Sequence, residues 1–172
     1  VRGNSTISQY YQNDAATASA IDADGWFGTG DVATLDARGC LTITDRAKDL
    51  IKSGGEWISS LDIENIAMSH PDVRQCAVIA VPHEKWGERP LLIVVPEAES
   101  TADLAGILAL IGKHVSSWQV PDDIVLTDRL PLAPTGKISK KDLREIYADY
   151  VFRQNREEIK GFLNFLVIEK KK

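Results

Sequence analysis

Two short, continuous apolar runs constrain the fold of this chain more than any other feature. Residues 76–81 and 91–95 carry only apolar side chains, and most of these are Val, Ile or Leu. Both runs fall far short of the ~20 residues that a membrane-spanning helix needs. Runs of this length are typical of strands that are buried inside a globular domain. We therefore expect a small sheet built around these two strands.

The segments around the two runs predict the rest of a compact domain. In chain order they predict two short strands flanking a glycine turn, a helix, the two apolar strands, a further helix, a short strand and a last helix. These segments are residues 49–52, 57–58, 60–69, 76–81, 91–95, 101–115, 123–126 and 140–150. Ser59 or Ser60, and Ser139, fit helix caps, and Pro71 disfavours helix at the residue before it. The expected fold class is α+β, a split βαβ sheet with its helices on one face.

Residues 1–44 have a different character. Residues 1–24 are small and polar with little periodicity, which predicts a loop or the margin of a larger domain. Two β-type runs at 32–35 and 41–43 enclose turn residues and predict a hairpin. The expected organisation is therefore a β-rich segment at 1–44, a compact α+β domain at 45–150 and a helical tail of unknown role at 151–172.

Composition excludes several classes of function. The chain has 25 acidic and 20 basic residues, which argues against a general nucleic-acid binder. Its two cysteines are too few for a disulfide framework or a four-cysteine zinc site, which favours a cytoplasmic setting. The histidines His70, His83 and His114 are scattered without metal-ligand spacing, so no metal site is expected. The apolar face of the predicted tail helix leaves a membrane-peripheral location as the alternative.

The first candidate segment, residues 25–31, has the sequence Gly-Trp-Phe-Gly-Thr-Gly-Asp. The carboxylate of Asp31 could accept two hydrogen bonds from the hydroxyls of a ribose. The alternative is an ordinary glycine turn that leads into the predicted hairpin.

The second candidate segment, residues 45–59, alternates charges along a short linker and contains the pair Gly54 and Gly55. Arg46 carries a planar guanidinium that fits ribose or phosphate oxygens. The two glycines would let a ligand approach the backbone closely. The alternative is a solvated hairpin with surface ion pairs.

The third candidate segment, residues 130–140, places Lys137 after two prolines and a glycine. A lysine on so stiff a loop could be delivered to a carboxylate or phosphate as a positive charge. The segment is not a Walker phosphate loop, because the leading glycine and its four-residue spacer are missing. The alternative is a helix-entry loop with a solvated lysine.

Taken together, in this order and at these separations, the three segments resemble the carboxy-terminal part of the adenylate-forming acyl-CoA synthetases. That superfamily also includes firefly luciferase and the adenylation domains of peptide synthetases. The likeness extends over about residues 1–150, and residues 45–64 look most like medium- and long-chain fatty-acyl-CoA ligases. The resemblance implies that 45–150 is a mobile lid and that 1–44 is a remnant of a large amino-terminal adenylation domain.

Members of this family convert a carboxylic acid, ATP and CoA into acyl-CoA, AMP and pyrophosphate through an acyl-adenylate. The resemblance implies that Lys137 is the catalytic lysine of adenylation and that Asp31 and Arg46 bind the nucleotide. It places the hinge at Asp45 and Lys48, with Lys48 and Asp49 solvated in both lid orientations. It assigns the CoA-side loop to Lys52, Gly54, Gly55, Glu56 and Trp57. The parent enzyme is expected to use Mg²⁺, with no ligand for it in this chain.

The resemblance also implies that the chain is a piece of a longer enzyme. The chain opens with Val1 and its only methionine is Met68, whereas a complete translation product begins with Met. No phosphate loop or acyl pocket is present, so the chain alone is expected to be inactive and to need the amino-terminal domain as its partner. The parent enzyme is compatible with a homodimer. Two alternatives stay open: the lid of an aryl- or short-chain-acid CoA ligase, and a stand-alone α+β interaction module.

Overall fold

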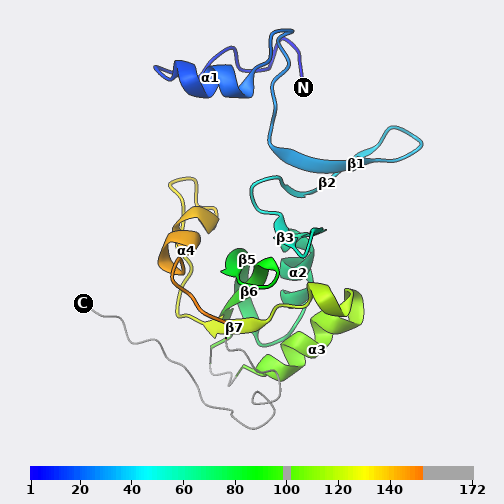
Figure 1. Ribbon diagram of the computed structural model, residues 1–172, viewed down its shortest axis with the longest axis vertical. Coiled ribbons are helices and arrows are strands. Elements are labelled where there is room, and N and C mark those ends of the chain that lie inside the picture. Colours follow the sequence, from blue (N-terminus) through cyan, green and yellow to red (C-terminus); the bar gives the residue numbers. More distant parts are fainter. Residues whose placement is uncertain (99–101, 153–172) are drawn as a thin grey trace. The chain divides into compact units, whose positions relative to one another are not determined.

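The computed structural model describes residues 1–98 and 102–152 (Figure 1). The chain divides into two compact units, Val1–Lys48 and Asp49–Lys172. The expected boundary after residue 44 falls inside strand β2, Leu41–Arg46, whose pairing with β1 continues to its last residue. Each unit is therefore described by itself.

The first unit contains helix α1 and one β-hairpin. Strands β1, Asp31–Leu35, and β2 pair antiparallel, which confirms the predicted hairpin. Helix α1, Asp14–Ala20, shows that the prediction of a loop is wrong for these residues, whereas the rest of 1–24 forms no named helix or strand. The side chain of Asn13 accepts a hydrogen bond from the Ala16 N–H and caps this helix. The alanine-rich sequence then favours helix by intrinsic propensity, a signal that periodicity alone does not reveal.

The second unit is an α+β domain whose sheet is centred on strand β6. Its elements are β3 Ile51–Ser53, β4 Glu56–Ile58, α2 Ser60–Ala67, β5 Val73–His83, β6 Gly87–Pro96, α3 Leu104–His114, η1 Ser117–Gln119, β7 Asp123–Leu126 and α4 Lys140–Ile146. The long strand β5 pairs antiparallel with β6 on one side. On the other side β6 pairs antiparallel with β3 and parallel with β7. The predicted fold class and the predicted order of elements are confirmed.

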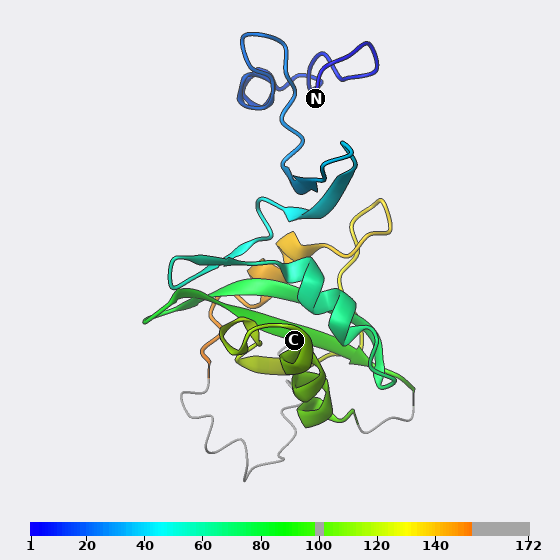
Figure 2. The ribbon, with the colours of Figure 1, turned by 90° about the vertical axis from the view of Figure 1, so that its right-hand side faces the viewer.

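The helices of this unit cover both faces of the sheet. Helices α2 and α3 lie side by side on one face, against Val78, Leu92 and Val94 (Figure 2). Helix α4 packs through Leu143 on the other face, against Ala77, Ile79, Leu91 and Ile93. The prediction of helices on one face is therefore wrong. Because β5 and β6 are apolar at consecutive positions, both of their faces need a cover.

The chain leaves its last helix earlier than the sequence predicts. Helix α4 ends at Ile146, whereas the prediction continued to residue 150. The following aromatic residues turn back onto the sheet: the Tyr150 hydroxyl donates to Asp123 Oδ2 at 2.6 Å, and Phe152 is buried. Most of the predicted tail helix lies outside the described residues. Within them, no helix is long and apolar enough to cross a membrane.

Candidate functional site

The β1–β2 hairpin brings Asp31, Asp45 and Arg46 together at one end. Asp31 and Arg46 are direct cross-strand partners, and Arg46 Nε lies 3.4 Å from Asp31 Oδ1. Asp45 is buried, and its Oδ1 accepts the Arg46 N–H at 2.7 Å. Gly30, with φ +72, turns the chain into β1. The result is a carboxylate beside an exposed guanidinium, a pair that suits a diol and an anionic oxygen respectively.

The β3–β4 hairpin holds all five residues of the predicted CoA-side loop. Gly54 and Gly55 have φ of +59 and +93 and form a two-residue turn that the right-handed twist of the strands favours. Lys52 and Trp57 are cross-strand partners, with Lys52 Nζ 5.5 Å from the centroid of the Trp57 ring. The side chains of Lys52, Glu56 and Trp57 are exposed. This hairpin therefore exposes a cationic, an anionic and an aromatic side chain around two glycines that have no side chain of their own.

Trp86 lies directly beneath the glycine turn. The Gly54 N–H donates to the Trp86 carbonyl at 2.8 Å, and a Cβ at Gly54 would lie 3.0 Å from the Trp86 ring. The close approach explains why position 54 needs glycine. An open pocket of about 660 Å³ adjoins this turn and is lined on its aromatic side by Trp86, Trp118 and Phe152.

Arg89 fixes the base of the hairpin, and sequence reasoning missed it. It is buried at 5% exposure and makes five hydrogen bonds, two of them to the carboxylate of Asp122 and one to Ser53 Oγ. The other two reach the backbone carbonyls of Trp118 and Val120. All five guanidinium N–H groups are thereby used. The available signal was a single arginine at the head of the apolar run, where a buried charge requires partners.

Lys137 lies on a short looped segment between β7 and α4. Leu132 and Ile138 form an isolated antiparallel bridge, and the Ala133 N–H donates to the Lys137 carbonyl at 2.7 Å. Gly136, with φ +80, makes the turn. Lys137 itself is exposed, and no carboxylate of the described residues lies within ion-pair distance of it. The ammonium of Lys137 is therefore exposed on a loop whose backbone is held by hydrogen bonds.

The first turn of α4 is attached to α2 by a largely buried polar cluster. Lys140 Nζ lies 2.8 Å from Glu64 Oε1 and donates to Ser60 Oγ at 2.7 Å. Glu64 Oε1 also accepts the N–H of Val78 on strand β5, at the edge of the sheet. Burial, reinforced by the charge of Glu64 and partly offset by that of Lys140, raises the pKa of the Cys76 thiol to about 12. This thiol is consequently not a nucleophile at neutral pH.

Arg144, in the last turn of α4, binds Asp49, the residue that follows the predicted hinge residue Lys48. Arg144 donates from Nη1 and Nη2 to Asp49 Oδ1, at 2.9 and 3.0 Å. The Asp49 side chain is only 10% exposed, so the expectation that it is solvated is wrong. Lys48 is exposed, as expected.

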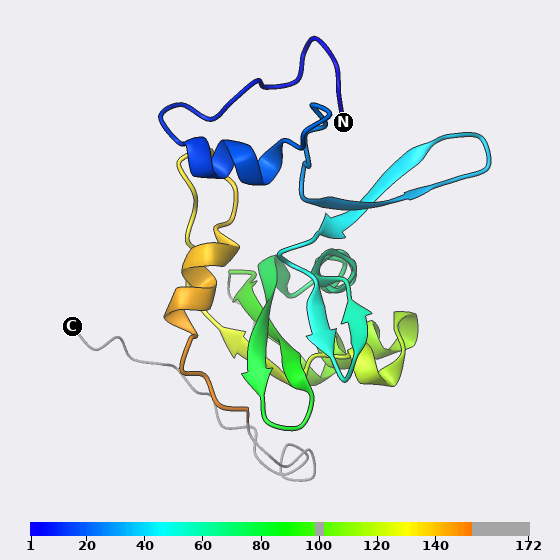
Figure 3. The same ribbon diagram turned by 45° about the horizontal axis from the view of Figure 1, so that its top comes forward.

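Within the second unit, the Lys137 loop lies with α4 on one face of the sheet, whereas the glycine turn joins the two strands β3 and β4 at one edge of that sheet. Figure 3 shows α4 and the loop before it on one side of β5 and β6, and the β3–β4 hairpin on the other. The packing agrees, because Ile138 contacts the same core cluster as α4 whereas Ile51 and Ile58 belong to the opposite cluster. The two groups of predicted site residues therefore do not form one site within this unit.

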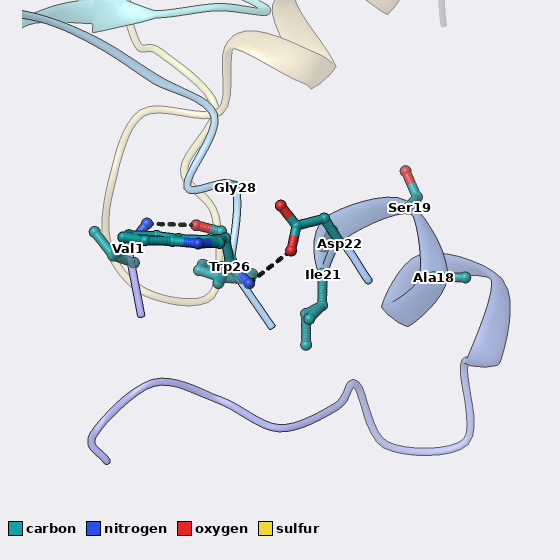
Figure 4. Close-up of a pocket in the computed structure, with 9 residues that line it drawn as sticks. Val1, Ala18, Ser19, Ile21, Asp22, Trp26 and Gly28 are labelled. Atoms are coloured by element: carbon teal, nitrogen blue, oxygen red, sulfur yellow. Dashed lines mark hydrogen bonds between the residues drawn. The ribbon is translucent and has the colours of Figure 1, made fainter. Parts of the chain in front are cut away.

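A further pocket, of about 470 Å³, lies in the first unit between α1 and the Trp26–Gly28 segment (Figure 4). Asp22 is its only acidic side chain, and Asp22 Oδ1 already accepts the N–H groups of Asp24 and Trp26. These bonds shape a turn rather than offer a reactive group. Among the residues that the structure describes, no group of three or more His, Cys, Asp or Glu side chains could hold a metal ion.

Comparison with known proteins decides the family. Residues 62–137 match the model of the AMP-binding enzyme C-terminal domain. The chain carries this domain. It is 52% identical over 149 residues to the 3-methylmercaptopropionyl-CoA ligase of Ruegeria pomeroyi, a match that covers 87% of the chain and 27% of the relative. It is 49% identical over 141 residues to the long-chain-fatty-acid–CoA ligase of Thermus thermophilus, which covers 82% of the chain and 26% of the relative. The chain thus spans about a quarter of the length of these relatives.

Similar solved structures confirm the fold. The ATP-bound MatB of Rhodopseudomonas palustris superposes with a TM-score of 0.75 at 34% identity, over 82% of this chain and 28% of that one. The fatty acyl CoA synthetase of Mycobacterium tuberculosis superposes with a TM-score of 0.62 at 38% identity, over 82% and 28%. The resemblance inferred from the three sequence segments is therefore confirmed at the level of the family.

Proposed function

We propose that this chain supplies the C-terminal lid of an AMP-forming fatty-acyl-CoA ligase, together with a short part of its adenylation domain. The observation that carries the proposal is the exposed ammonium of Lys137 on a backbone fixed by the Leu132–Ile138 bridge. A lysine without a carboxylate partner in the described chain keeps its charge available for a ligand.

In the adenylation step, a carboxylate oxygen of the acid attacks the α-phosphorus of ATP and pyrophosphate leaves. Two anions must approach each other, so a positioned ammonium lowers the barrier electrostatically. Lys137 is assigned this role. The site is pre-organised, because Ile138 packs into the core and the Ser139 N–H donates to the Pro131 carbonyl at 2.8 Å.

The nucleotide is assigned to the open end of the β1–β2 hairpin. Asp31 would accept hydrogen bonds from the ribose hydroxyls, and Arg46 would approach the nucleotide from the neighbouring strand. The existing pair between them is long, at 3.4 Å, and the Arg46 side chain is 57% exposed. A ligand can therefore displace it at little cost.

In the thioester step, the thiol of CoA attacks the acyl carbon and AMP leaves. The β3–β4 hairpin is assigned to the thiol side, because its glycines leave the backbone accessible at Gly54 and Gly55. The two loops belong to different parts of the domain, one on the α4 side of the sheet and one at the β4 edge, so a rotation of the lid at Lys48, just after Asp45 at the end of β2, would exchange one for the other. Mg²⁺ would accompany ATP in the parent enzyme and would be bound outside this chain.

The assignment to fatty acids rests on the medium- and long-chain ligases among the relatives. The acyl pocket is expected outside this chain, so acid specificity would reside in the amino-terminal domain, the proposed partner. Relatives named as a trans-cinnamate:CoA ligase and a feruloyl-CoA synthase match at 38% and 41% identity and support an aromatic acid as the second candidate. The parent enzyme is proposed to be cytoplasmic and to form a homodimer through its large domain.

The test is a hybrid enzyme in which this chain replaces the matching part of the Ruegeria pomeroyi ligase. Adenylation is measured by pyrophosphate exchange, and the thioester step by adding CoA to preformed acyl-adenylate. Lys137→Ala should lower adenylation by roughly 10²–10³-fold, because the charge acts in that transition state, and should affect the thioester step far less. Lys141→Ala, an exposed lysine of α4, is the matched control. Unchanged adenylation in Lys137→Ala would show that the assigned role is wrong.

The chain alone should form no acyl-CoA from ATP, Mg²⁺ and a fatty acid. Adding a separately prepared amino-terminal domain should restore turnover. Turnover by the isolated chain would contradict the proposal that it acts as a lid, and a well-folded chain that restores nothing would favour the interaction-module alternative.

A further inference from the structure

Strand β5 has one edge without a neighbouring strand. It lies at the end of the strand order β4-β3-β6-β5, and β6 is its only strand partner among the described residues. The strand is 11 residues long, and Ala77, Val78, Ile79 and Val81 are at most 1% exposed. A long apolar edge of this kind is a template on which another strand can pair through backbone hydrogen bonds. We therefore expect a device beside β5 that blocks this pairing.

Glu64 of helix α2 occupies the outer edge of β5 near its middle. Its Oε1 accepts the Val78 N–H at 2.7 Å, so this donor points away from β6. Backbone groups alternate between the two edges of a strand, and the register of β5 against β6 has no irregularity after position 75. Positions 80 and 82 therefore face outward as well, but Pro82 has no N–H to offer. Ala80 is thus an outward donor between a capped position and an empty one.

Lys140 of helix α4 holds the Glu64 carboxylate against the strand. Lys140 Nζ lies 2.8 Å from Glu64 Oε1 and donates to Ser60 Oγ at 2.7 Å. The two charged side chains are 16% and 14% exposed, so surrounding atoms fix their positions. Because α2 and α4 pack on opposite faces of the sheet, the pair joins these faces around the edge of β5. An incoming strand would have to displace it.

We propose that the Glu64–Lys140 pair guards the outer edge of β5, and that this edge is a latent interaction surface for a second copy of the chain. The same edge of another β5 fits it, because two antiparallel copies offer each other the same donors and acceptors about a two-fold axis. With the Val78 N–H already bound and no N–H at Pro82, a ladder of successive hydrogen bonds cannot form. The inference is independent of the proposed function.

The guard is tested on the 172-residue chain with two variants that differ in one group. Lys140→Met/Glu64→Gln removes both charges but keeps a side-chain carbonyl that can accept the Val78 N–H. Lys140→Met/Glu64→Ala removes the charges and the acceptor and opens the edge. In light scattering at increasing protein concentration, the Gln form should keep the mass of the unaltered chain, and the Ala form should rise toward twice that mass. At low concentration, hydrogen exchange of the Val78 amide should be roughly 10-fold faster in the Ala form only.

A third variant shows whether the association uses this edge. Ala80→Pro, added to the Glu64→Ala form, removes the next outward N–H and should return the mass to that of the unaltered chain. Proline is tolerated on an edge strand where its nitrogen faces outward, as at Pro82. Lys141→Ala is the matched control, because this lysine of α4 lies in an exposed pair, and it should leave the mass unchanged.

The inference is overturned by a folded Glu64→Ala form whose mass does not depend on concentration. It is equally overturned if the Glu64→Gln form associates to the same extent, or if Ala80→Pro does not reverse the association. Circular dichroism establishes that each form is folded. If the Glu64→Ala form fails to fold, Lys140→Met/Glu64→Leu, an apolar pair of similar volume that also lacks the acceptor, decides on the same readouts.

Discussion

The two β-hairpins of this chain are built alike but buried very differently. In β1–β2 the apolar side chains of Leu35, Leu41 and Ile43 are 68%, 65% and 54% exposed. In β3–β4 the inward side chains of Ile51 and Ile58 are fully buried against α2 and α3. The same strand-turn-strand pattern therefore occurs in two different packing environments. One hairpin is part of a domain that closes its own core, and the other presents an apolar edge for which the proposed amino-terminal domain would supply the cover.

Truncating one apolar residue in each hairpin gives the largest expected difference. Ile58→Ala should lower the free energy of unfolding of the second unit by about 2–5 kcal/mol, because it leaves a cavity in a closed core. Leu41→Ala should change it by about 0.5 kcal/mol or less, since the side chain is already in water. Urea unfolding followed by circular dichroism measures both. Equal effects would mean that β1–β2 is buried in solution and that the comparison fails.

Removing one ion-pair partner from each unit tests the same contrast for charges. The Lys140–Glu64 pair is 16% and 14% exposed, so Lys140→Met should cost about 2–4 kcal/mol by leaving Glu64 buried without its partner. The Arg46–Asp31 pair is 57% and 25% exposed, so Arg46→Met should cost about 0.5 kcal/mol or less. Denaturant midpoints are the measurement. Restoration of the lost stability by Glu64→Leu in the Lys140→Met background would attribute the loss to the uncompensated charge.

The glycine turns of β1–β2 and β3–β4 differ in what surrounds them, because only the turn of β3–β4 packs against a tryptophan ring. Gly39 and Gly54 both have positive φ, at +82 and +59, so alanine is strained at either position. At Gly39 a Cβ meets nothing within 4 Å, whereas at Gly54 it lies 3.0 Å from the Trp86 ring. Gly39→Ala should cost about 1 kcal/mol and Gly54→Ala about 2 kcal/mol, with a change in tryptophan fluorescence only for the latter. A larger loss at Gly39 would contradict the packing argument.

The two cysteines provide the mildest test, because labelling one of them should leave stability unchanged. Cys40 is exposed in the β1–β2 hairpin and should react completely with a disulfide reagent at pH 8. Cys76 is buried with a pKa of about 12 and should react only after unfolding. Because the unfolded thiol ionises near pH 9.0, the folded state binds more protons above that value. Stability should therefore fall as pH rises from about 9 to about 12, and Cys76→Ala should reduce that slope.

Local pattern predicted most of the second unit. The apolar runs predicted β5 and β6, and serine caps at Ser59 or Ser60 and at Ser139 predicted the starts of α2 and α4. The pair Gly54 and Gly55 predicted the tight turn of β3–β4, and both have positive φ. These features depend on neighbours in sequence, which is why they can be predicted. The apolar residues at consecutive positions in β5 and β6 also contained the information that both faces are covered, although the sequence interpretation placed the helices on one.

The site was predicted unevenly for the same reason. Asp31 and Arg46 flank the predicted hairpin of residues 32–35 and 41–43, so the hairpin itself brings them together. Arg144 and Asp49 are 95 positions apart, and Arg89 and Ser53 are 36 positions apart. The sequence around Asp49 does not indicate that Arg144 binds it, and the sequence around Arg89 does not indicate Ser53. Only the tertiary fold reveals these two pairs.

The two-glycine turn between β3 and β4 also determines when conformational entropy is lost. Glycine loses more backbone freedom on ordering than any other residue. Here that loss occurs during folding, because Ser53 pairs with Glu56 and the Gly54 N–H binds the Trp86 carbonyl before any ligand arrives. When a ligand binds to this hairpin, the backbone of the turn is already ordered, and only side chains lose conformational entropy. A flexible loop at the same position would add the entropy cost of ordering its backbone to the free energy of binding.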